Sequence, residues 1–254
     1  MKIHLFKCSL MIGLTVLILT PVQAVEESDL IAILESSAGV PAKCAACQQL
    51  RIHGTAQSVP ILATLLAEKR AGHAARYALE GMPYAEAGAA LRDALSKTSG
   101  LTKAGLVDSL GWRRDRAAVP LLASLLSDQD SMLAAASASA LGRIAGPGAV
   151  TVLNGARQNA DAQVRQAVLE ALLHCAEARL FAGDMSEAAS LYRDLFQAQV
   201  PQMIRTAAWR GWALADPDQG ARLIVQALKG TDESLHQAAL KLVREGKDAQ
   251  VVHA

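Results

Sequence analysis

The chain has 254 residues, of which 52% are hydrophobic, 4% aromatic and 19% charged, and its formal net charge is +1. This near-neutral balance gives no sign of a strongly basic face, which argues against nucleic acid as the main partner. Aromatic residues are few while alanine and leucine are abundant. Such a composition is typical of closely packed helices that bury small side chains.

The first 24 residues have the layout of a secretory signal peptide. Lys2 and Lys7 precede an apolar run over 9–19, and a small-residue site ends at Ala24. An uncleaved membrane anchor is the alternative, but the apolar run is shorter than the roughly 20 residues that a spanning helix needs. We expect a signal peptide over 1–24, cleavage after Ala24, no membrane span afterwards, and a periplasmic or secreted mature chain. Without the two lysines its net charge is −1.

Three cysteines remain after cleavage, which permits at most one internal disulfide. Cys44 and Cys47 form a CxxC pair, a spacing that serves redox exchange, metal binding or haem attachment. Haem attachment would need a histidine where Gln48 stands, and only His53 lies close enough to assist a metal site. We interpret both thiols as small packing residues on a helix. A redox or haem-associated role for Cys44 and Cys47 is the alternative.

Two series of leucines recur along the chain with a period of about 31 residues. One series is spaced 29, 31, 31 and 31, and consists of Leu50, Leu79, Leu110, Leu141 and Leu172. The other is spaced 29, 31, 31, 38 and 32, and consists of Leu62, Leu91, Leu122, Leu153, Leu191 and Leu223. Two interleaved series with one period predict alternating first and second helices joined by turns. We expect glycines near the first series, Gly54, Gly81, Gly111 and Gly146, to end the first helices.

The expected elements fill almost the whole mature chain. A capping helix within 25–40 covers the open end of the array, the repeats occupy 41–245, and 246–254 form a frayed tail. The predicted helices are 28–37, 41–53, 57–68, 72–81, 84–97, 100–112, 116–126, 130–145, 147–157, 161–182, 185–198, 201–215, 217–229 and 232–245.

Three motifs in these repeats resemble those of HEAT-repeat proteins. Residues 161–172 read DAQVRQAVLEAL, which is similar to the D-x-x-V-R-x-x-A-x-x-A-L start of a HEAT first helix. Residues 204–207 repeat its core, and a Val-Pro pair opens two second helices at Val59 and Val119. The resemblance implies an all-α fold, an α-solenoid built as a superhelix of antiparallel hairpins. One segment, 183–192, instead resembles the turn and second-helix start of a tetratricopeptide repeat (TPR).

Two sets of residues are candidates for partner binding. The first is the turn that follows the helix expected at 100–112, because tryptophan and arginine are favoured in binding hot spots. It contains Trp112, Arg113, Arg114 and Arg116. In the simpler interpretation Asp115 caps the next helix and the arginines are solvated. The second set follows from the resemblance, since second helices line the concave face of HEAT arrays, and it contains Arg92, Arg157 and Arg193.

These observations predict a non-enzymatic scaffold or accessory subunit of an exported system, which binds a protein on its concave face or hairpin turns. The expected partner is a protein, such as an exported enzyme, and no cofactor is expected. Besides the redox alternative, a lyase acting on a bound chromophore, resembling the HEAT-like bilin lyases, remains open. That alternative requires a groove with convergent polar groups.

Overall fold

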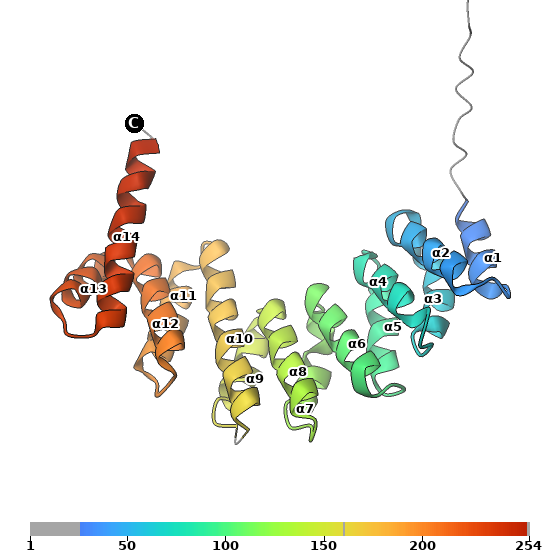
Figure 1. Ribbon diagram of the computed structural model, residues 1–254, viewed down its shortest axis with the longest axis horizontal. Helices are drawn as coiled ribbons and strands as arrows, with labels where there is room; N and C mark the ends of the chain where they lie inside the picture. Colours follow the sequence, from blue (N-terminus) through green and yellow to red (C-terminus); the bar gives the residue numbers. More distant parts are fainter. Residues whose placement is uncertain (1–25, 160, 253–254) are drawn as a thin grey trace, which may run out of the picture.

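The computed structural model describes residues 26–159 and 161–252, and over these ranges it contains helices and turns but no strand. The helices form an arc with α1 at one end and α14 at the other, open toward the top of Figure 1. The predicted all-α solenoid is therefore confirmed. The expected signal peptide lies outside the described residues.

Six antiparallel hairpins follow one another in the described ranges, and α14 then adds a further first helix. The first helices are α2 (Val40–His53), α4 (Gly72–Gly81), α6 (Gly100–Trp112), α8 (Ser131–Ile144), α10 (Ala162–Phe181), α12 (Gln202–Ala215) and α14 (Glu233–Val252). The second helices are α3 (Val59–Leu65), α5 (Ala85–Leu95), α7 (Val119–Leu125), α9 (Pro147–Gly155), α11 (Met185–Gln197) and α13 (Pro217–Lys229). Ahead of them, α1 (Glu27–Glu35) packs on α2 and α3. No helix in the described ranges is long and apolar enough to span a bilayer.

The helices begin where the local chemistry favours a start. Pro60 and Pro120 occupy the first turns of α3 and α7, where the missing amide proton has no intrahelical acceptor to lose. Asp130 and Asp161 cap α8 and α10 by accepting hydrogen bonds from amides of the first turn. The Val164 amide and the Ser131 hydroxyl, which both donate to Asp161, lower the pKa of that carboxyl group.

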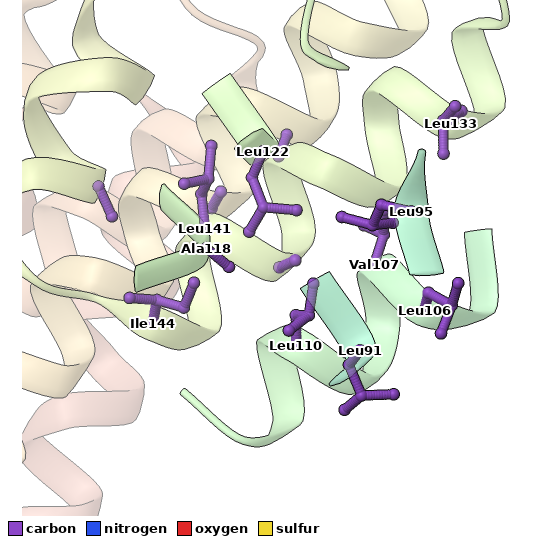
Figure 2. Close-up of a cluster of buried hydrophobic side chains, with 14 of the residues drawn as sticks. Leu91, Leu95, Leu106, Val107, Leu110, Ala118, Leu122, Leu133, Leu141 and Ile144 are labelled. Carbon is purple, nitrogen blue, oxygen red and sulfur yellow. The ribbon is translucent and has the colours of Figure 1, made fainter. Parts of the chain in front are cut away.

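The leucines of the two predicted series form most of the core. All five leucines of the first-helix series are at most 1% exposed, and Leu62, Leu91, Leu122 and Leu153 of the second-helix series are fully buried. Figure 2 shows Leu91, Leu110, Leu122 and Leu141 among the side chains that fill the space between neighbouring hairpins. A smaller cluster around Trp209, Leu223 and Ala239 forms the core of the last hairpin and α14.

One expectation about an individual residue was wrong. Leu191 is only partly buried, and its neighbour Tyr192 takes the core position in α11, because the longer α10 shifts the register of this hairpin. Gly111 is the next-to-last residue of α6, which ends at Trp112 as expected. The chain also departs from the expected tail at 246–254, because α14 continues to Val252. No proline interrupts this last stretch, and a helix with satisfied backbone hydrogen bonds continues through it.

The first helices approach one another closely through small residues. A Cβ atom built on Gly111 would lie 2.8 Å from Cα of Ala140 in α8, and one built on Gly142 would lie 2.8 Å from Cα of Ala171 in α10. Real Cβ atoms do not reach such distances, so any side chain at either glycine would push the two helices apart. The two contacts lie 31 residues apart and set the spacing of α6, α8 and α10.

We expect Gly142→Ala to lower the free energy of unfolding by about 1–3 kcal/mol, because the added methyl group overpacks a backbone contact. Gly155→Ala is the matched control, since a Cβ at Gly155 in α9 would meet no atom within 4 Å. It should be neutral or slightly stabilising, because alanine favours helix more than glycine does. Urea midpoints measure both changes. Equal midpoints for the two variants would contradict the close contact.

Candidate interaction surface

The turn after α6 is a compact C-terminal cap. Arg114 has a φ of +51°, and the Asp115 amide donates to the Leu110 carbonyl at 3.0 Å, as in a Schellman motif. Oδ1 of Asp115 accepts from the Ala117 amide at 3.0 Å, so the predicted capping role of Asp115 is confirmed. This geometry exposes Arg114 and Arg116 and directs Arg113 back toward the preceding hairpin.

The Arg113 side chain forms hydrogen bonds within the fold. Its Nη1 donates to the carbonyls of Leu79 at 2.6 Å, Glu80 at 3.1 Å and Met82, and its Nη2 donates to the Tyr84 carbonyl at 2.9 Å. Burial lowers the pKa of the Arg113 guanidinium, opposed by the charge of Asp115, and an arginine remains charged under such a shift. The expectation of a side chain free to bind a partner was therefore wrong for Arg113. It caps the C-terminal end of α4.

The arginines expected on the second helices are partly engaged within the array. Arg92 forms an ion pair with Asp115, and its side chain is 24% exposed. Arg157 is partly buried and donates from Nη2 to the Asp194 carbonyl at 3.4 Å, while Arg193 is exposed on α11. In Figure 1 the second helices lie behind the first helices, and the open side of the arc is lined by helix ends and hairpin turns. Arg157 therefore lies beside α11, next to Arg193, while Arg92 is held by Asp115.

A row of equivalent positions crosses the C-terminal halves of three first helices. Trp112 on α6, Arg143 on α8 and His174 on α10 are each 31 residues apart and each lie two residues beyond a buried leucine of the first-helix series. The Arg143 guanidinium carbon lies 4.8 Å from the ring centroid of Trp112. The three helices lie side by side in the middle of the arc (Figure 1), so this row forms a continuous surface.

This surface contains a groove of about 420 Å³, which we call the first-helix groove. Its small lining residues are Gly111, Ser139, Gly142, Ala171 and Ala178, and its larger ones are Trp112, Arg114, Arg143, Glu170, His174, Glu177 and Phe181. Trp112 is 61% exposed and Phe181 is 84% exposed. Two large aromatic residues with such exposure beside one groove make it a candidate interaction surface.

Charge is unevenly distributed around the first-helix groove. Arg114 and Arg143 lie toward α6, and Nη1 of Arg143 is 2.7 Å from Oδ1 of Asp108. Glu170, His174 and Glu177 lie on one face of α10, where Nδ1 of His174 is 3.5 Å from Oε2 of Glu177. The groove therefore presents positive charge toward α6 and carboxylates toward α10.

Of the residues predicted for partner binding, only Trp112 and Arg114 line the first-helix groove. Sequence reasoning missed Arg143, Glu170, His174, Glu177 and Phe181. A signal for two of them was present, because Arg143 and His174 follow Trp112 at the repeat spacing of 31 residues. Comparing the same register position in each repeat would have placed them on one surface.

The cysteines are packing residues. Cys44, Cys47 and Cys175 are all free thiols. Cys47 is fully buried within α2, and burial raises its pKa to about 11. Burial likewise raises the pKa of Cys175 to about 12. A reactive thiol needs the opposite shift, so the structure gives no support to redox exchange at Cys47. The described residues contain no cluster of three or more potential metal ligands.

Comparison with known proteins identifies the central repeats. Residues 88–173 match the family model described as HEAT repeats, a segment that contains α6, α8 and the first part of α10. Over this segment the chain is similar to HEAT repeats. The segment includes the sequence motif at 161–172 and most of the residues that line the first-helix groove, whereas His174, Glu177, Ala178 and Phe181 lie beyond it. HEAT repeats are in general a protein-binding architecture.

Two solved structures, both engineered proteins from the Northeast Structural Genomics Consortium, are similar to this chain. One is 21% identical with a TM-score of 0.42, and the match covers 84% of this chain and 66% of the engineered one. The other is 20% identical with a TM-score of 0.34, and the match covers 87% and 97%. No curated protein is significantly similar to the sequence.

Adjacent arginines should differ in their effect on stability. Arg113→Ala leaves carbonyl groups at the end of α4 without their donor, and we expect a loss of about 2 kcal/mol. Arg114→Gly should be neutral or stabilise by about 0.5–1 kcal/mol, because glycine tolerates a positive φ. Thermal unfolding of both variants measures the difference. An Arg113→Ala variant as stable as the wild type would contradict the capping role.

Alkylation should distinguish the three thiols. At pH 8 we expect iodoacetamide to modify Cys44 first, because it is partly exposed, while Cys47 and Cys175 react only after unfolding. The raised pKa values also act on stability. The unfolded thiols ionise near their ordinary pKa of 9.0, whereas the folded ones retain their protons. The contribution of the thiols to the free energy of unfolding is therefore present below about pH 9 and is lost as the pH rises toward 11. Mass spectrometry of labelled peptides is the measurement, and labelling of Cys47 as fast as Cys44 would restore the redox alternative.

Proposed function

We propose that this protein is an exported, non-enzymatic accessory protein that binds another protein across the first-helix groove. The observation that carries the proposal is the pair of exposed aromatic residues, Trp112 and Phe181, at a groove floored by glycine and alanine. Binding hot spots combine such aromatic anchors with neighbouring arginine, here Arg114 and Arg143. The repeat architecture supports this role, since stacked hairpins provide extended surfaces for partners.

Export is supported by the sequence of the first 24 residues, which lie outside the described part of the chain. A partner in the same compartment would be a second exported protein, such as an enzyme that this protein positions or stabilises. The near-neutral charge of the chain favours a protein over a nucleic acid.

The two alternatives have weaker support. Redox exchange would need a low thiol pKa, which Cys47 does not have. A lyase site would enclose most of a chromophore-sized ligand. The first-helix groove instead lies across the C-terminal halves of three neighbouring helices, beside two side chains that are mostly exposed. Its shape therefore fits a protein surface better than a small molecule.

Affinity capture with groove variants tests the proposal. The mature protein, Trp112→Ser/Phe181→Ser, and the control Leu101→Ser/Met132→Ser would each be incubated with the exported fraction of the source cells. The control removes equally exposed apolar side chains, 86% and 66% exposed, from the opposite ends of the first helices. We expect the wild type and the control to recover the same proteins by quantitative mass spectrometry, and the groove variant to lose them. Equal recovery by all three proteins would contradict the proposal.

A further inference from the structure

Two neighbouring gaps between first helices have the same backbone geometry. Cβ atoms built on Gly111 and Gly142 would lie at matching distances from Ala140 and Ala171, 2.8 Å to Cα and 2.9 Å to Cβ in each case. The α6–α8 gap and the α8–α10 gap therefore have the same glycine–alanine backbone contact at their base, which we call the floor. Only the side chains above that floor differ.

The α6–α8 gap is occupied by an arginine of the chain itself. Nη1 of Arg143 would lie 3.3 Å from a Cβ on Gly111, which places the guanidinium over that glycine. The same nitrogen contacts Oδ1 of Asp108 at 2.7 Å, and the guanidinium lies against the ring of Trp112. A small-residue floor, a carboxylate and an aromatic ring together hold this side chain.

The α8–α10 gap lacks that occupant. At the equivalent positions Ser139 replaces Asp108 and His174 replaces Arg143, and both side chains are shorter. The first-helix groove includes both residues together with Gly142 and Ala171. The second gap is therefore open where the first is filled.

The groups around the open gap favour a cation at its α10 side. Glu170 and Glu177 flank His174 on α10, and all three line the groove. Glu170 accepts from Nε2 of Gln166 at 2.8 Å, and Glu177 contacts His174. The other charged groups of the groove are Arg114 and Arg143, of which Arg143 is paired with Asp108. Phe181 adds an exposed aromatic ring beside these carboxylates.

We propose that the α8–α10 gap receives an arginine side chain of the partner protein, seated over Gly142 as Arg143 is seated over Gly111. This inference rests on the proposed function and adds the chemistry of its partner. Arginine is favoured over lysine because its planar guanidinium binds carboxylates through two donors and stacks on aromatic rings. Arg114, at the α6 side of the groove, would meet an acidic or neutral part of the same partner.

Titration with a blocked amino acid tests the site without knowledge of the partner. N-acetyl-arginine-N-methylamide would be added to the isotope-labelled mature protein, with the lysine and citrulline analogues in parallel, and backbone amide shifts followed by NMR. We expect saturable shifts at Gly142, Ala171 and His174 with the arginine probe. The lysine analogue should bind about tenfold more weakly and citrulline should not bind.

Three double variants make the test specific. Glu170→Gln/Glu177→Gln should weaken the arginine probe about tenfold, whereas Glu35→Gln/Glu86→Gln, the same charge change at exposed sites outside the groove, should not. Ser139→Asp/His174→Arg rebuilds the Asp108–Arg143 pair in the second gap and should abolish binding by filling it. Absence of saturable shifts, or equal shifts with all three analogues, would overturn the arginine site. The proposed function would survive that result if partner capture still required Trp112 and Phe181.

Discussion

The close contact between neighbouring first helices is the constraint on which the rest of the structure depends. Gly111 against Ala140 and Gly142 against Ala171 bring α6, α8 and α10 together along their backbones. Large side chains are excluded from these contacts, whereas the buried leucines form the core away from them. The 31-residue period of the sequence reflects this stacking, because the Gly142–Ala171 contact repeats the Gly111–Ala140 contact one period later.

The same constraint shapes the binding surface. Small residues at a helix contact leave a shallow channel above it, and the side chains that follow each glycine decide whether the channel is filled. Arg143 fills the first channel by pairing with Asp108 and covering Trp112. His174 and Ser139 leave the second one open. A regular scaffold thus gains a particular surface through changes at single register positions, without any change in its backbone contacts.

Much of the fold could be predicted because its signals are local and periodic. The helix boundaries, the burial of the first-helix leucines and the Asp115 cap depend on residues close in sequence. The structure confirms these three predictions. Arg113 was misread because its acceptors are carbonyl groups about 30 residues earlier in the chain. The packing role of Gly111 was not predicted, because its contact with Ala140 involves another helix. The groove required knowing that Glu170, Glu177 and Phe181 of one long helix face the same space as Trp112.

Hydrogen–deuterium exchange of the protein alone and with a captured partner tests whether the partner binds at the first-helix groove, because it reports which surface becomes protected. We expect slower exchange in the C-terminal halves of α6, α8 and α10 and in the turn at 113–115, with α7, α9 and α11 unchanged. Protection confined to the second helices, with the first-helix groove exchanging as in the free protein, would contradict it.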